Sequence, residues 1–338
     1  MSQNGITERE NLQLVFDGKQ PEWVPLAEEC ADFAMNGFLM QWYKPGVVST
    51  DVFGAKYYTE DPRVGPMPIA GEPLLGNIHE WREKVLFPDL KSIDWEEWAA
   101  KDTARWNRRE KMSQVMMSGS ANGAVFQLMV TLMSHEGALY ALADEDDEEE
   151  WHNLLGSLTD WTEELIKNTI KHYKPDVVCI CDDNASKNSS FMSPATFRKM
   201  IKPYHQRLAQ TVVDCGCIPT LHCCGNVEKL FADFIEVGYR GWDPSQVQND
   251  LKGMKAAYGK NIVFFGGWDS QGVVNQAGAR EEDVRAAVRR SFEILAPGGG
   301  YVWSTSGMLL PWDIGEEQAG WVSDEARKCS REFYASQR

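Results

Sequence analysis

Short apolar runs alternate with longer amphipathic stretches through the second half of the chain. The apolar runs are typical of buried strands, and they occupy residues 176–181, 218–222, 239–243, 262–267 and 301–304. The amphipathic stretches predict helices at residues 193–215, 227–237, 251–258, 281–295 and 316–337. Strand and helix in regular alternation predict βαβ units and therefore a parallel sheet.

The first half of the chain gives a less regular pattern. Residues 23–27 (WVPLA) are suited to a first buried strand, and residues 124–130 (AVFQLMV) predict another. Residues 102–117 are polar and helix-forming, with Asp102 placed to cap a helix. Frequent Gly, Pro and Trp between residues 28 and 101 indicate long connections and short hairpins.

These elements predict an α/β fold, a single (β/α)₈ TIM barrel with an enlarged N-terminal region that spans residues 1–338 as one domain. Barrels of this kind often run to about 250 residues or more. A doubly wound open sheet is the alternative. No G-x-G-x-x-G motif follows a predicted strand, which weakens a dinucleotide-binding version of that sheet.

The charge balance narrows the classes of partner. The chain carries 34 Lys and Arg against 50 Asp and Glu, a formal net charge of −16. Nucleic acids and anionic membranes are both recognised by basic surfaces, so neither is expected as a partner. No signal peptide or long apolar span is visible, and the eight cysteines lie mostly in strand-like or helix-like segments, so we expect a reduced, cytoplasmic protein.

The densest run of charge is acidic and lies at residues 144–150 (DEDDEEE). One interpretation is a docking patch for a partner. The other is the first turn of the helix that follows, where acidic side chains interact favourably with the helix dipole. The sequence favours the helix start.

Polar residues follow most predicted strands at their carboxyl ends. In parallel barrels the chemistry is carried by the loops that begin there. The residues in these positions are Glu28, Asp182, Asp183, Asn184, His222, Cys224, Asp243, Asp269, Ser304 and Ser306. A single polar residue at a strand end is an ordinary cap, but a series of them predicts a ligand pocket.

The sharpest local feature is the segment His222-Cys223-Cys224-Gly225-Asn226. Residues two apart in a strand face the same side, so His222 and Cys224 are expected to point together into the barrel mouth. An imidazole and a thiolate suit Zn²⁺, and a catalytic zinc takes three protein ligands. A carboxylate such as Asp243 or Glu28 is a candidate third ligand, or there is none. The alternative is a buried histidine with two buried cysteines.

The order of these pieces resembles the uroporphyrinogen decarboxylase superfamily, which includes cobamide-dependent methyltransferases. The motifs that carry the resemblance are Pro21-Glu22-Trp23-Val24-Pro25, Ser193-Pro194, Pro203-Tyr204-His205, His222 to Asn226, Gly266-Gly267-Trp268-Asp269 and Pro297-Gly298-Gly299-Gly300. The resemblance implies a TIM barrel, often dimeric, with zinc held by His222 and Cys224. It departs at Ser306-Gly307, where the methyltransferases have a further zinc-binding cysteine.

The decarboxylases of this superfamily bind the carboxylates of their substrate with an Arg-rich N-terminal loop. The equivalent residues 28–33 in this chain are acidic and contain no Arg. A polyanionic porphyrinogen would be repelled there. The methyltransferase branch instead implies an O-demethylase. Such an enzyme moves a methyl group from a small methoxylated, aromatic substrate to the Co(I) corrinoid of a partner protein. A decarboxylase of another acid and a non-catalytic binding barrel are the alternatives.

The resemblance also suggests roles for the residues at the strand ends. Asp182, Asp183 and Asp243 are expected to orient or protonate the substrate close to the zinc. The aromatic rings of Trp268 and Trp303 are expected to stack on the substrate ring. The remaining substrate-binding candidates are Glu28, Asn184, Asp269 and Ser306.

Overall fold

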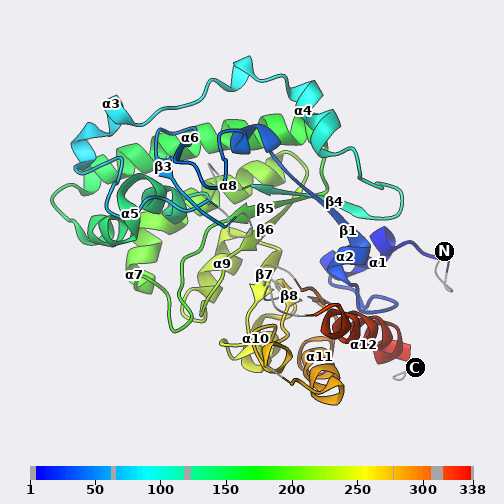
Figure 1. Cartoon of the computed structure of the whole chain (residues 1–338). Helices are drawn as coiled ribbons and strands as arrows, with labels where there is room; N and C mark the ends of the chain where they lie inside the picture. The colour runs from blue at the N-terminus through cyan, green and yellow to red at the C-terminus, as the bar shows by residue number, and fades with distance from the viewer. Residues whose placement is uncertain (1–4, 62–65, 118–122, 277, 306–314, 336–338) are drawn as a thin grey trace.

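The computed structural model describes residues 5–61, 66–117, 123–276, 278–305 and 315–335. Its centre is a curved sheet of seven parallel strands in the order β1-β4-β5-β6-β7-β8-β9 (Figure 1). These strands are β1 (Ala31–Met35), β4 (Met112–Met117), β5 (Val177–Cys181), β6 (Ile218–His222), β7 (Gly241–Ser245), β8 (Val263–Gly266) and β9 (Tyr301–Val302). A short antiparallel pair, β2 (Ser49–Thr50) and β3 (Lys56–Tyr57), lies outside this sheet.

The two edges of the sheet approach each other where the chain enters β1. Leu26 forms a parallel bridge with Trp303, just beyond β9. The Trp303 N–H donates to the Pro25 carbonyl, and the Ala27 N–H donates to the Trp303 carbonyl. In the described residues the sheet therefore has seven strands and one closing bridge. This confirms a parallel, barrel-like α/β fold, whereas the predicted eighth strand is not present in the part of the chain that the structure describes.

Helices follow the strands and cover the outside of the sheet. They are α1 (Glu8–Phe16), α2 (Ala27–Cys30), α3 (Trp81–Lys84), α4 (Trp95–Asp102), α5 (Phe126–Ala143), α6 (Glu148–Tyr173), α7 (Pro194–Thr196), α8 (Lys202–Asp214), α9 (Phe231–Val237), α10 (Leu251–Tyr258), α11 (Glu281–Leu295) and α12 (Glu316–Ala335). In Figure 1 the segment with α3 and α4 lies outside α6, and α12 lies beside α11. None of the described helices is both long and apolar enough to cross a membrane.

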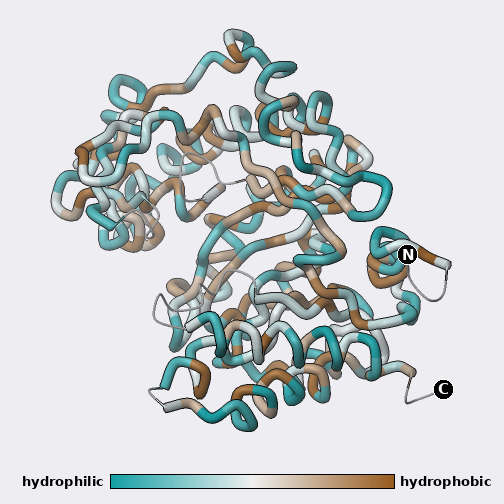
Figure 2. Tube along the Cα trace, turned by 45° about the vertical axis from the view of Figure 1, so that its right-hand side comes forward, coloured by the Kyte–Doolittle hydropathy of each residue, from teal (hydrophilic) through white to brown (hydrophobic). Residues whose placement is uncertain are grey.

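The strands predicted beyond residue 176 are confirmed to within two residues at each end. Helices α10 and α11 begin and end at the predicted residues. Their apolar positions repeat at helical spacing, and the apolar strand runs are buried on both faces, as in a sheet covered by helices. Figure 2 shows this separation, with hydrophobic positions along the central strands and hydrophilic ones along the outer helices.

Three predictions for the first half are wrong. Residues 126–130 of the predicted strand 124–130 begin helix α5, and β4 lies in the segment 102–117 that was predicted to be helical. The WVPLA run forms only the bridge at Leu26, because Pro25 has no N–H to donate to a strand ladder. The first strand is β1, so Glu28 lies in α2 rather than after a strand.

Helix α1 closes the amino end of the barrel. Its buried residues Leu12, Val15 and Phe16 form one apolar cluster with inward-facing residues of the strands, among them Met112 and Val177. Arg9 on the same helix pairs with Asp176 at 2.5 Å, just before β5. With this end sealed, ligands reach the interior from the carboxyl ends of the strands.

The acidic run at residues 144–150 begins helix α6, as the helix-start interpretation predicts. Side chains of this run also form hydrogen bonds with the segment that contains α3. Glu150 accepts hydrogen bonds from Arg82 and, at 2.8 Å, from Trp81 Nε1, and Asp147 lies 2.9 Å from His79 Nε2. The run therefore ties part of the enlarged N-terminal region to the barrel.

Candidate active site

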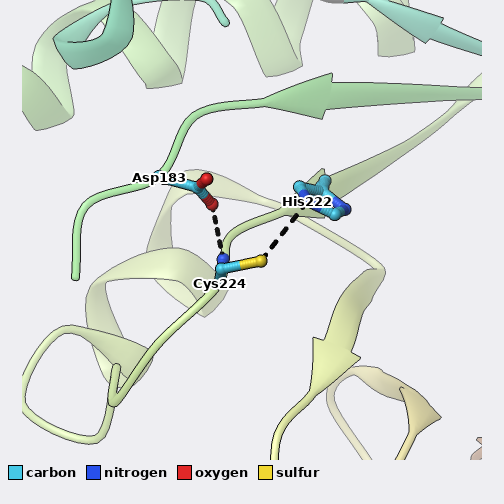
Figure 3. A group of neighbouring side chains, drawn as sticks. All are labelled: Asp183, His222 and Cys224. Carbon is cyan, nitrogen blue, oxygen red and sulfur yellow. Dashed lines mark hydrogen bonds between the residues drawn. The ribbon is translucent and has the colours of Figure 1, made fainter. Parts of the chain in front are cut away.

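Three side chains meet at the carboxyl ends of β5 and β6. Asp183, His222 and Cys224 each present one ligand atom, and these atoms all lie within 4.8 Å of one another (Figure 3). The Cys224 Sγ is 3.6 Å from His222 Nε2. The Cys224 backbone N–H donates to Asp183 Oδ1 at 2.6 Å. The predicted pair of His222 and Cys224 is therefore brought together, and the carboxylate beside it is Asp183.

Asp243 orients the imidazole of His222 by a hydrogen bond at Nδ1, the ring nitrogen that does not face Cys224. Its Oδ2 lies 3.0 Å from His222 Nδ1, which leaves Nε2 directed toward Cys224. Burial lowers the pKa of His222, but the hydrogen bonds with Asp243 and Cys224 outweigh burial, so this pKa lies well above its usual value. Burial raises the pKa of the Cys224 thiol, and His222 offsets part of this rise. Metal binding here would release the protons that both groups hold without it.

The three donor atoms fit a zinc ion. Nitrogen and sulfur ligands at their usual zinc distances and a tetrahedral angle lie about 3.5 Å apart, close to the separation seen here. Asp183 Oδ1 accepts the Cys224 N–H, and the carboxylate contributes one oxygen to the cluster. Asp243 supplies the carboxylate that commonly supports a metal-bound histidine. A set of three protein ligands leaves a fourth position for substrate.

Gly225 shapes the loop that carries Cys224. Its φ is +93°, and a Cβ there would lie 2.6 Å from the carbonyl oxygens of both Ala185 and Ser186. Both oxygens belong to the loop after β5, the loop that also carries Asp183. The absence of a side chain at Gly225 therefore lets the two metal-site loops pack against each other.

The Gly225→Ala variant should consequently lower the free energy of unfolding by about 2 kcal/mol, through left-handed strain and the clash with backbone oxygens. Gly238→Ala is the matched control, since its φ is +105° but nothing lies within 4 Å of the added carbon. The control should lose about 1 kcal/mol in urea unfolding. Equal losses in the two variants would show that the contact between the loops is unimportant.

Asp182 points away from this group and into the core. Its carboxylate is fully buried and accepts the backbone N–H groups of Val125, Phe126 and Gln127. His205 Nε2 lies 2.9 Å from Asp182 Oδ2, and His205 Nδ1 lies 2.7 Å from the Tyr239 hydroxyl. Asp182 thereby caps the start of α5. The structure does not bring it to the metal ligands, although it is adjacent to Asp183 in sequence.

Asn184 is also fully buried. Its Nδ2 donates to the backbone carbonyl of Asp182 at 2.8 Å and to that residue's Oδ2 at 3.0 Å. Its backbone N–H donates to Cys223 Sγ. These contacts stabilise the loop that carries Asp183 and leave none of the Asn184 side chain facing solvent.

A cavity of about 480 Å³ opens inside the barrel next to these residues. We refer to it as the barrel cavity, and its lining residues are Ala27, Glu28, Phe33, Ala34, Met35, Gln114, Met116, Thr220, Asp243, Phe265 and Ser304. Asp243 connects it to His222. Phe33 and Met35 are 51% and 41% exposed although they lie on a strand, because they face this open space.

The other predicted substrate-binding residues lie in different surroundings. Glu28 lines the barrel cavity and accepts hydrogen bonds from the Thr305 N–H and hydroxyl. Trp268 and Trp303 are buried and pack on each other with ring centroids 6.0 Å apart, so neither presents a free ring face to the barrel cavity. Asp269 is exposed in the loop after β8. Ser306 lies outside the described residues.

Sequence reasoning missed the aromatic and thioether walls of the barrel cavity. These walls are Phe33, Met35, Met116 and Phe265. Apolar residues on strands usually signal a filled core, so composition alone gives no sign that these four face a hollow. Asp183 was recognised as a candidate, but as an acid rather than as a metal ligand.

The motifs and the fold point to one family. The model of the family described as uroporphyrinogen decarboxylase (URO-D) matches residues 86–328. The chain belongs to the uroporphyrinogen decarboxylase family. The matched region extends from the segment before α4 into α12 and so includes the metal-site residues.

Two further comparisons find similarity to methyltransferases. The Methylcobamide:CoM methyltransferase MtaA of Methanosarcina barkeri is 27% identical over 130 residues, which are 37% of this chain and 36% of that protein. The chain thus matches about a third of the length of this curated relative. A methyltransferase structure from Methanosarcina mazei has a TM-score of 0.65 at 16% identity, covering 97% of this chain and 99% of that one. At that identity the likeness shows a shared fold.

Proposed function

We propose that this protein is a cobamide-dependent methyltransferase that takes a methyl group from a methoxylated aromatic compound and transfers it to the Co(I) corrinoid of a separate protein. The observation that carries the proposal is the cluster of Asp183, His222 and Cys224 beside an apolar cavity inside the barrel. Family membership and the similarity to MtaA support it.

Asp183, His222 and Cys224 would hold a zinc ion at the cavity edge. When bound, such an ion would supply a Lewis acid for the ether oxygen. That oxygen needs help because methyl transfer breaks the bond between oxygen and the methyl carbon, and the electron pair stays on oxygen. The phenolate that leaves is a poor leaving group, since the conjugate acid of a phenolate has a pKa of about 10.

The side chains around the cavity would orient the substrate. Phe33 and Phe265 offer ring faces or edges to an aromatic donor, and Met35 and Met116 adapt to its outline. This role replaces the stacking role predicted for Trp268 and Trp303, whose rings are packed in the core. Holding the methyl carbon toward the open barrel mouth would let a corrinoid protein approach it in line.

Asp243 has a positioning role in this scheme. It fixes the ring orientation of His222 through Nδ1, which keeps Nε2 available. The Asp182 carboxylate is not part of the metal-ligand cluster. It fixes the start of α5 and the loop that carries Asp183. We therefore assign neither carboxylate to proton transfer.

The test is to mix the protein with a reduced corrinoid protein and methoxylated benzenes, and to follow the methyl-cobalt absorption. We expect the spectrum to change with the wild type, and at least a 100-fold slower change with Cys224→Ala, since one metal ligand is lost. Cys215→Ala is the control, because that cysteine is exposed and lies just beyond the carboxyl end of α8, outside the metal-ligand cluster. No spectral change with any methoxylated donor would contradict the proposed reaction.

A further inference from the structure

We propose that the barrel cavity selects methyl donors that carry no negative charge, so neutral methoxybenzenes are preferred over methoxybenzoates. This inference rests on the proposed function and concerns the charge of the donor. The observation behind it is the lining of the cavity, where the titratable side chains are the two carboxylates Glu28 and Asp243 and no Lys, Arg or His is present among the described residues.

The two carboxylates reach the cavity from different elements of the barrel. Glu28 comes from α2, before the first strand, and Asp243 comes from β7. Glu28 is held in place by the backbone N–H and hydroxyl of Thr305, at 3.0 and 2.6 Å. Thr305 is uncharged, so its hydrogen bonds fix the position of the Glu28 carboxylate without neutralising its charge.

A bound zinc would leave this negative charge in place. Cys224 as thiolate and Asp183 as carboxylate offset the two positive charges of the ion, and His222 binds as a neutral ring. Glu28 and Asp243 then remain as excess negative charge at the cavity wall. The net charge of −16 over the chain has the same sign and adds to the repulsion of anions.

Lys111, just before β4, donates from Nζ to the backbone carbonyl of Glu28 at 3.1 Å and pairs with Asp32 at 3.2 Å, but it is not among the residues that line the cavity. A carboxylated substrate normally needs Arg or Lys as its counter-ion. The apolar walls at Phe33, Met35, Met116 and Phe265 suit an uncharged ring instead.

The test compares 1,2-dimethoxybenzene with 3,4-dimethoxybenzoate, which share the ring and both methoxy groups and differ in one carboxylate. In the methyl-cobalt assay we expect kcat/KM to be at least about tenfold higher for the neutral compound. Glu28→Gln should reduce this ratio several-fold by faster turnover of the benzoate. Glu29→Gln is the matched control and should keep the wild-type ratio, because Glu29 pairs with Arg327 at 2.9 Å and does not line the cavity.

Binding measured by calorimetry separates this inference from the proposed reaction. If neither compound is demethylated but the neutral one binds at least tenfold more tightly, the reaction is wrong and the charge selection stands. Equal or tighter binding of the benzoate, or a ratio unchanged by Glu28→Gln, overturns the charge selection. Failure of both compounds to bind overturns the assignment of the cavity to aromatic donors.

Discussion

Replacing His222 with Ala is expected to reduce the zinc content of the purified protein from about one ion per chain to less than a tenth of that. His222 contributes the only imidazole in the cluster, and its Nε2 lies 3.6 Å from Cys224 Sγ. Removing it leaves a thiol and a carboxylate, which are too few ligands for a stable site. The measurement is metal analysis after dialysis against a zinc buffer, with folding checked by circular dichroism.

A graded series makes this prediction sharper. Asp243→Asn keeps all three ligands but weakens the support for His222, and should lower zinc affinity by about 10–100-fold. Asp183→Ala should lower zinc affinity more than this, while Asp269→Ala, which changes an exposed carboxylate at another strand end, should have no effect. Unchanged zinc in His222→Ala would rule out the metal site, and unchanged zinc in Asp183→Ala would mean that the third ligand is another group.

The sequence was most informative where strands are buried on both faces. The run before Asp182 and the run that ends at His222 are apolar and bounded by turn residues, so their type and limits were predictable. Strand β1 was not predicted, because its five residues (ADFAM) are few and do not alternate regularly between polar and apolar side chains. Strand β4 was missed because its local composition also suits a helix.

The metal site was predictable in part for a similar reason. The positions of His222 and Cys224 follow from the spacing of two residues along an extended chain. The third ligand depends on register between strands, since Cys181 pairs with His222 and therefore Asp183 lies opposite Cys224. Local pattern does not fix register in a parallel sheet. The same alternation sends the adjacent residue, Asp182, to the opposite side, where it caps α5.

The Asp182→Asn variant is expected to lower the free energy of unfolding at neutral pH by about 4 kcal/mol, since each buried donor left without a partner costs about 1–3 kcal/mol. An amide presents one acceptor oxygen where the carboxylate presents two. The carboxylate accepts three backbone N–H groups, and His205 Nε2 lies 2.9 Å from it. Some of these buried groups would lose their partner. His205→Phe should have a similar cost, and the double variant should lose less than the sum.

The pH dependence gives this prediction its clearest signature. Burial raises the pKa of Asp182, but the interactions with His205 and the backbone N–H groups of α5 outweigh burial, so the pKa is lower in the folded protein. The stabilisation from this group is therefore complete above about pH 4, the unfolded value, and is lost as the pH falls through the folded pKa. In urea unfolding between pH 3 and pH 7, the wild type should lose more stability on acidification than Asp182→Asn does. Asp160→Asn, at a carboxylate that is 71% exposed, should follow the wild type within about 0.5 kcal/mol. Parallel pH profiles for the wild type and Asp182→Asn would show that the buried carboxylate does not stabilise the start of α5 as a charged group.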